Sequence, residues 1–264
     1  MNATWRVRLF FRSYAALVLT FMYVPLLVVI VLSFNSSASL AWPPKGFTTR
    51  WWSRAFQNDG AREALLVSLK TATGATLVAL LLGAMAAFAV HRFRFFGRDT
   101  LSLLIVLPIA LPGIVTGIAL NAAFREVGIE FGLLTLIIAH ATFCIVVVYN
   151  NMIARVRRLT PSLDEASADL GADAFQTFRY VTFPLVRTAL LAGGLLAFGL
   201  SFDEIVVTTF TSSAGLETLP LWIFRNLSRG EQQPIVAAVA TAVMLLSVGP
   251  VFLAQRITAG GRER

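Results

Sequence analysis

The stretch SFDEIVVTTFT, residues 201–211, places two adjacent carboxylates in an otherwise apolar region. On one continuous helix Ser201, Glu204 and Thr208 would share a face, and Asp203 would point about 100° away. Acidic side chains along a water-filled path through a membrane would attract a cation, whereas they would repel an anion. These four residues therefore predict a substrate pathway for a positively charged solute. The alternative is that both acids lie at a helix end among lipid headgroups.

An acidic, polar passage separates two of the most apolar stretches: LDEASADLGADAFQTFRYVTFP, residues 163–184. Pro161 and the Ser162-x-x-Glu165 capping box predict the start of a short helix, and Gly171 predicts its end, because glycine adopts the left-handed conformation freely. A second short helix is expected to follow. The passage carries apolar side chains that a free loop cannot bury, and these predict a partner surface: Leu163, Ala166, Leu170, Phe175 and Phe178. The alternative is a solvated loop with a well-capped helix.

Catalytic chemistry has few candidates in this sequence. His140 and Cys144 are four residues apart, as two metal ligands on one helix face would be, but no third ligand stands on a neighbouring stretch. A buried histidine or cysteine is more often a packing residue. Lys45 and Lys70 are the only lysines, and neither belongs to a G-x-x-x-x-G-K-[ST] phosphate loop. We therefore expect no catalytic residue, metal or cofactor in this chain. If the chain takes part in transport driven by ATP, a separate protein would use the ATP with Mg²⁺.

The composition indicates an all-α membrane protein. The 264 residues are 57% hydrophobic and 14% charged, which is more apolar than a soluble globular chain. A helix needs about 20 apolar residues to cross the hydrocarbon core. Six stretches meet this requirement and form one predicted transmembrane domain, residues 14–255: 14–34, 65–90, 101–124, 131–154, 188–211 and 235–255.

The distribution of basic residues orients these spans. With the N-terminus in the cytoplasm, the four inner segments carry 14 arginines, and the three outer segments carry seven Lys and Arg residues. Cytoplasmic loops are enriched in Lys and Arg, so both termini, 1–13 and 256–264, and the loop 155–187 are predicted to be cytoplasmic. The formal net charge of +8 comes from arginines placed beside apolar runs. That pattern is typical of membrane-flanking charge and not of a nucleic-acid surface.

The acidic passage resembles the EAA loop of the integral-membrane subunits of ABC importers, whose pattern is E-A-A, three residues, G, nine residues, I-x-L-P. Every spacing is kept, with serine, valine and phenylalanine in place of the third-position alanine, the isoleucine and the leucine: Glu165, Ala166, Ser167, Gly171, Val181, Phe183 and Pro184. Four further stretches are similar to the polyamine (putrescine and spermidine) branch of this family: LPIALPGIVTGIAL, HATFCIVVVYNNMIARVRRL, LAGGLLAFGLSFDEIVVTTFT and TLPLWIF. The resemblance covers residues 14–255.

The resemblance implies a type I importer permease fold (MetI-like) in a bacterial cytoplasmic (inner) membrane. It implies a partner set of two ABC ATPase copies, a second permease subunit and an external solute-binding protein, besides the lipid bilayer. It also implies that the helix of the loop docks in a groove of the ATPase. The residues implied in this coupling are Asp164, Glu165, Ala166, Ser167, Asp169, Leu170, Gly171, Ala172, Phe175 and Phe178.

The implied mechanism is alternating access, with a polyamine as the expected solute. Iron(III) or a sugar remains an alternative within the family, and a secondary transporter is an alternative outside it. A secondary transporter would call for an internal repeat, and none is convincing between residues 1–130 and 131–264.

Proline and glycine residues in the third predicted span are expected to kink it. Pro108, Pro112 and Gly113 could serve a gate there, or close packing alone, since both residue types are ordinary in membrane helices. Two short helices are expected in the outer loops. One is predicted around residues 48–57, where tryptophans cluster, and the other over 219–227.

Overall fold

The computed structural model describes residues 5–160 and 162–259, with the backbone alone at Arg6 and at residues 248–259. Three parts of predicted features lie outside the described residues: 1–4 of the N-terminus, 260–264 of the tail, and Pro161.

Helices make up the regular structure of the described residues, apart from one isolated antiparallel bridge between Asn35 and Phe47. The all-helical fold class is therefore confirmed. The chain divides into two compact units. The smaller unit consists of residues 1–62 and 223–251, and the larger one of residues 63–222 and 252–264.

The smaller unit contains α1 (Trp5–Leu32), α2 (Arg50–Phe56) and most of α12 (Gln233–Ala259). Asn35 is buried and organises the loop between α1 and α2. Its side chain accepts hydrogen bonds from the backbone N–H groups of Ser37 and Lys45. Its carbonyl accepts a 2.8 Å hydrogen bond from the indole of Trp51. The helix predicted around residues 48–57 is confirmed by α2.

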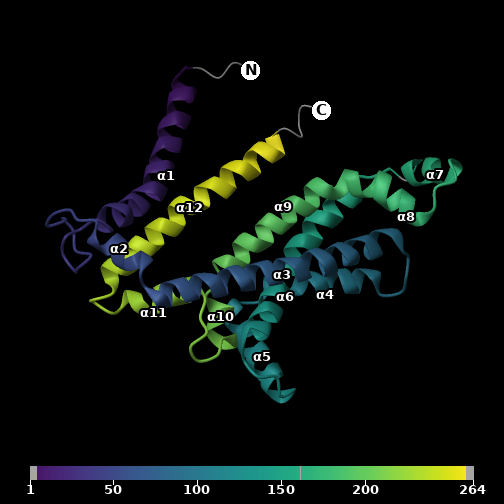
Figure 1. The fold of residues 1–264 in the computed structure, drawn as a ribbon. Coiled ribbons are helices and arrows are strands. Elements are labelled where there is room, and N and C mark those ends of the chain that lie inside the picture. Colours follow the sequence, from purple (N-terminus) through teal and green to yellow (C-terminus); the bar gives the residue numbers. More distant parts are fainter. Residues whose placement is uncertain (1–4, 161, 260–264) are drawn as a thin grey trace. The chain divides into compact units, whose positions relative to one another are not determined.

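The larger unit holds the other helices: α3 (Asp59–Arg92), α4 (Arg98–Ala110), α5 (Gly113–Glu126), α6 (Leu133–Val156), α7 (Ser162–Asp169), α8 (Ala174–Thr177), the π-helix η1 (Phe178–Thr182), α9 (Phe183–Phe202), α10 (Val206–Thr211) and α11 (Leu219–Leu227). Of these, α3 begins in the smaller unit and α11 ends there. The bounds of α11 match the predicted outer-loop helix. Within this unit, α7 and α8 lie at one end of α9 and α10 lies at the other (Figure 1).

Among the residues that the structure describes, four helical segments are long and apolar enough to cross a membrane: Val7–Leu32, Asp59–Arg92, Leu133–Val156 and Ala174–Phe202. The pair α4 and α5 passes the same test together, although its two halves are bent by 107°. A multi-pass membrane protein is therefore confirmed.

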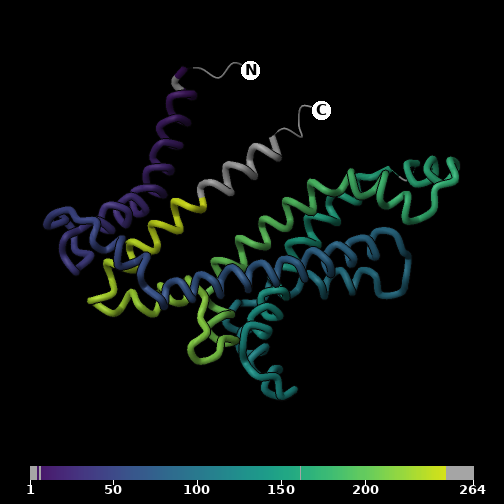
Figure 2. Tube along the Cα trace, in the orientation of Figure 1, coloured from purple at the N-terminus to yellow at the C-terminus, as the bar shows by residue number. Residues whose placement is uncertain are grey.

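The core of the larger unit is the antiparallel pair of α6 and α9, whose backbones run side by side (Figure 2). Four contacts mark its register: His140 with Ser201, Cys144 with Ala197, Val148 with Gly193, and Arg155 with Leu185. Over the first three contacts, each step of four residues along α6 is matched by a step of four back along α9. One turn of helix separates successive contacts, so one face of each helix is used throughout.

Small residues allow α3 to pack closely on α6. Ala75, Ala79 and Ala87 are fully buried, and Gly83 lies on the same face between them. A Cβ atom on Gly83 would lie 2.9 Å from the carbonyl oxygen of Ile145, which is closer than such atoms approach. Small residues at helix interfaces bring backbones together, the usual basis of packing between membrane helices.

We expect Gly83→Val to destabilise the protein by about 1–3 kcal/mol, because the added side chain would be forced against the backbone of α6. Gly199→Val is the matched control, since no atom lies within 4 Å of a Cβ placed on Gly199. Thermal unfolding of both variants in detergent checks the expectation. Equal shifts in Tm would show that α3 does not pack on α6 in this way.

Two predicted spans are each divided in the structure. The stretch 101–124 forms α4 and α5, which are separated by Leu111 and Pro112. Pro112 has no N–H to continue a helical ladder, and it pushes the residue before it into an extended conformation, as observed at Leu111 (φ −82°, ψ 142°). The stretch 188–211 is likewise divided: α9 ends at Phe202 and α10 begins at Val206.

Candidate functional site

The break between α9 and α10 contains the two adjacent carboxylates. The backbone N–H of Asp203 still bonds to the carbonyl of Gly199, so α9 continues to this point. The Oε1 atom of Glu204 then accepts a 2.8 Å hydrogen bond from the N–H of Val207. This N–H belongs to the first turn of α10, where it has no partner within the helix. Glu204 therefore caps α10, and the two carboxylates are not on one continuous helix.

The two carboxylates differ in environment. Asp203 is exposed, whereas Glu204 is half-buried. Among the described residues, no hydrogen bond or ion pair involves the carboxylate of Asp203. The sequence-predicted pair is therefore split into one anchored acid and one acid with a free carboxylate.

His140 of α6 spans this break. Its Nδ1 atom lies 2.8 Å from the hydroxyl of Ser201 at the end of α9, and its Nε2 atom lies 2.9 Å from the hydroxyl of Thr208 on α10. Ser201 is 2% exposed, and the other two side chains are fully buried. We call these two hydrogen bonds the His140 bridge. Two residues of the predicted pathway, Ser201 and Thr208, are thus buried behind the break.

Further contacts hold α10 against its neighbours. The hydroxyl of Thr135 on α6 shares its proton between the carbonyls of Gly132 and Thr211, at 2.8 and 3.2 Å. The side-chain amide of Asn121 on α5 donates to the carbonyl of Phe210. A Cβ atom on Gly117 would lie 2.7 Å from the ring of Phe210, so α5 and α10 approach closely. The position of α10 is fixed from two sides.

The two helix breaks of the larger unit meet. A Cβ atom on Gly113, directly after Pro112, would lie 3.4 Å from the side chain of Val206, the first residue of α10. Gly113 and Pro112 are exposed, and Pro108 lies inside α4, within a turn of its end. One predicted kink residue, Gly113, therefore lies against the start of α10, although about 90 residues separate the two in the sequence.

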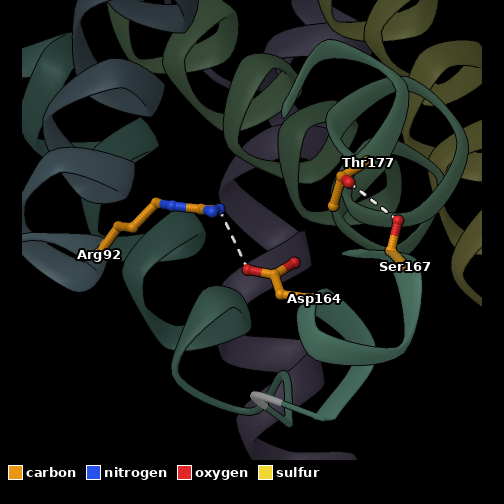
Figure 3. A network of polar contacts seen from close by, with 4 residues as sticks. All are labelled: Arg92, Asp164, Ser167 and Thr177. Carbon is orange, nitrogen blue, oxygen red and sulfur yellow. Dashed lines mark hydrogen bonds and ion pairs between the residues drawn. The ribbon is translucent and has the colours of Figure 1, made fainter. Parts of the chain in front are cut away.

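The acidic passage forms a compact hairpin, residues 162–177, built from α7, α8 and the turn between them. Gly171 has φ +78°, the left-handed conformation predicted for it. Asp173 caps α8 and exchanges two hydrogen bonds with Gln176. The hydroxyls of Ser167 and Thr177 meet at 2.8 Å and tie the two helices together (Figure 3). Ser167 is buried by this contact, so it holds the hairpin together instead of facing a partner.

Most other predicted coupling residues face outward. Leu170 is 89% exposed and Phe175 is 69% exposed. The remaining exposed members are Glu165, Ala166, Asp169, Gly171 and Phe178, and the half-buried ones are Asp164 and Ala172. Large apolar side chains with this exposure indicate a surface that another molecule covers.

The hairpin is attached to the end of α3. Arg92 donates a 3.1 Å hydrogen bond to Asp164, and the two groups form an ion pair (Figure 3). A cavity of about 220 Å³ lies beside it, lined by residues of α3, α6, α7, η1 and α9 that include Phe88, Leu163 and Leu185. Because both charged side chains are about half exposed, the pair adds no more than about 1 kcal/mol to stability. Its main effect is to fix where α7 lies.

The spacing of His140 and Cys144 does not build a metal site in the described residues, where no group of three His, Cys, Asp or Glu side chains comes together. The Cys144 thiol is buried and donates to the carbonyl of Ala197.

Sequence reasoning missed the role of His140 in the break. The signals available in the sequence were a lone histidine within an apolar span and the spacing of Ser201 and Thr208, which would share a helix face.

Residues 79–260 match the model of a protein family described as "Binding-protein-dependent transport system inner membrane component". The spermidine/putrescine transport system permease protein PotC of Haemophilus influenzae is 35% identical over 253 residues, which cover 95% of this chain and 97% of PotC. The putrescine transport system permease protein PotI of Escherichia coli K12 is 34% identical over 252 residues, which cover 92% of this chain and 87% of PotI.

Two solved structures share the fold. One chain of a bacterial ABC transporter involved in the import of the acidic polysaccharide alginate superposes with a TM-score of 0.73 at 16% identity, covering 98% of this chain and 99% of its own. A chain of an amino acid ABC transporter superposes with a TM-score of 0.55 at 18% identity, covering 80% of this chain and 100% of its own.

Proposed function

Because this chain belongs to the family of inner membrane components of binding-protein-dependent transport systems, we propose that it is the permease subunit of an ABC importer for a polyamine such as putrescine or spermidine. The chain itself is a transport component without catalysis. PotC and PotI, which it resembles over most of its length, carry these two solutes in their names.

The observation that carries the substrate class is the exposed carboxylate of Asp203 in a break between two apolar helices. A charged group is costly to place in a membrane, and it is retained where it serves an ion path. A polyamine carries two or more positive charges, so such a carboxylate lowers its cost of leaving water. In this proposal the cation passes Asp203, and Ser201, Glu204 and Thr208 form the wall behind it.

The proposed topology has six spans and cytoplasmic termini. The four long apolar segments supply four spans, and α4 with α5 supplies a broken fifth. The sixth is α12, which has 27 residues and an apolar stretch at Gln233–Ser247. The arginine-rich segments then face the cytoplasm. Residues 14–255 form a single transmembrane domain, with 1–13, 256–264 and the coupling loop 155–187 inside the cell.

The proposed partners follow from the surfaces of the chain. The hairpin exposes Leu170 and Phe175 beside acidic side chains, which suits docking in a groove of each of two ATPase copies. A second permease subunit completes the path beside Asp203. An external binding protein delivers the solute, and ATP with Mg²⁺ binds to the ATPase only. Closure of the ATPases then moves the hairpin, and the helices rearrange so that the path opens alternately to each side.

Uptake measurements test this function. The chain is produced with its second permease, ATPase and binding protein in a host that lacks its own polyamine importers. We expect saturable uptake of radiolabelled putrescine that stops when ATP is depleted and that spermidine inhibits. Uptake that persists without ATP and follows a proton gradient would identify a secondary transporter. Inhibition by iron(III) or a sugar, with none by spermidine, would identify another solute.

A further inference from the structure

We propose that His140 is a positioning residue for the cation pathway. Through its bridge to Ser201 and Thr208 it holds the break between α9 and α10 in the shape that exposes Asp203 and turns Glu204 into a helix cap. The role of Asp203 rests on the function proposed above, whereas the bridge and the cap rest on the geometry alone.

We infer the positions of the protons in the bridge from the partners of the Thr208 hydroxyl. The hydroxyl of Thr208 donates its one proton to the carbonyl of Glu204, at 3.0 Å. The same oxygen, 2.9 Å from Nε2 of His140, must then accept, so Nε2 carries a proton. In the neutral ring Nδ1 is an acceptor, and it receives the hydroxyl proton of Ser201. The protons therefore run in one direction from Ser201 through His140 and Thr208 to the backbone of Glu204.

This series of hydrogen bonds connects the two sides of the break, and both ring nitrogens of His140 have a partner. Both ends of the imidazole are satisfied in a site with no exposed surface, where an unpaired polar atom is costly. Ser201 is the last buried position of α9, and Thr208 lies in the first turn of α10. The bridge thus fixes the relative position of the two helices that Asp203 and Glu204 connect.

Glu204 is held at three points within this arrangement, and the first is its backbone N–H, which donates to the carbonyl of Ser201 at 3.5 Å. Its carbonyl accepts from Thr208, and its carboxylate accepts from the N–H of Val207. Among the described residues, in contrast, the one hydrogen bond that anchors Asp203 runs from its backbone N–H to the carbonyl of Gly199. The two adjacent acids therefore differ in role: Glu204 shapes the break, and Asp203 meets the solute.

Substitutions of Glu204 separate a cap from a cation ligand. Glutamine keeps an oxygen that can accept from Val207 but removes the charge, whereas alanine removes both. We expect Glu204→Ala to raise the KM for putrescine uptake about tenfold more than Glu204→Gln does, since it alone loses a capping bond. Equal effects of the two variants would show that the charge of Glu204 is what matters, and would overturn its assignment as a cap.

Substitutions of Thr208 test the bridge. Thr208→Val keeps the shape and removes the hydroxyl, so we expect KM to rise about tenfold with little change in maximal rate, and Thr208→Ser to recover most of the loss. Thr209→Val is the matched control. The hydroxyl of Thr209 bonds to the carbonyl of Ile205 as that of Thr208 bonds to Glu204, but in the described part of the chain it has no partner on α6. Equal effects of Thr208→Val and Thr209→Val would contradict the proposal.

A spectroscopic test is independent of the solute. The sequence has two histidines, His91 and His140, so an ¹⁵N-histidine spectrum of the purified complex can be assigned with a His91→Gln variant. We expect His140 to be neutral with its proton on Nε2, and Thr208→Val to change its signals. A proton on Nδ1, or on both nitrogens, would overturn the proposed direction of the protons, and signals that Thr208→Val leaves unchanged would overturn the bridge itself. Absence of putrescine uptake with the expected spectrum would refute the polyamine function and leave the bridge intact.

Discussion

Replacing Glu165 by lysine is expected to abolish coupled uptake while the protein still inserts in the membrane. Glu165 is exposed in the first turn of α7 and makes no hydrogen bond or ion pair among the described residues, so the hairpin should keep its fold. In the proposed complex this carboxylate meets a basic group of the ATPase. Charge reversal replaces attraction with a repulsion of several kcal/mol, which lowers uptake to about 1% of the wild-type rate or less.

Charge reversal elsewhere on the proposed cytoplasmic side is the control. Asp99 is exposed in the first turn of α4, and it lies outside the hairpin. We expect Asp99→Lys to retain uptake and ATPase co-purification, and Glu165→Lys to lose both at an equal amount of membrane protein. Wild-type uptake by Glu165→Lys, or co-purification of the ATPase with it, would remove the hairpin as the docking site.

Replacing Asp203 by asparagine is expected to raise the KM for putrescine about ten- to a hundredfold, since a hydrogen bond to a charged group contributes about 1.5–3 kcal/mol. Asparagine has nearly the same shape, and the backbone bond to Gly199 does not involve the side chain. The amount of protein in the membrane and the co-purified ATPase should therefore be unchanged. The measurement is the concentration dependence of radiolabelled putrescine uptake.

Glu130→Gln is the control for loss of one negative charge. Glu130 is exposed in the loop before α6, on the predicted outer side, and it is not at the break. We expect this variant to change KM by less than about threefold, since an exposed charge is screened by solvent and salt. If both variants leave KM unchanged, the cation passes somewhere other than the break.

Local features were predictable from the sequence because their causes are local. The bounds of α6 follow from an apolar run between Gly132 and the arginines that begin at Arg155. The turn of the hairpin follows from Gly171, which has the positive φ that glycine tolerates. The resemblance to an importer family was also visible, because the spacing of the EAA loop lies within 20 residues.

The division of the fifth span was not predictable in the same way. Apolar periodicity continues from α9 into α10, and Asp203 and Glu204 can both fit on a helix. The break depends on a partner from another helix, since His140 is 61 residues before Ser201 in the sequence. For Pro112 the sequence indicated a kink, but the bend of 107° depends on how α5 packs on α10. Contacts between distant segments decide such features.

The register of α6 and α9 has a consequence for how force can travel. Near the hairpin, Arg155 donates a hydrogen bond to the carbonyl of Leu185. His140 is hydrogen-bonded to Ser201, which lies about 24 Å further along α9. If one helix slid past the other by a full turn, all the contacts between these two points would have to break at the same time. A pull on the hairpin should therefore tilt both helices together as a lever, and the far end of that lever is where the acid of Asp203 stands.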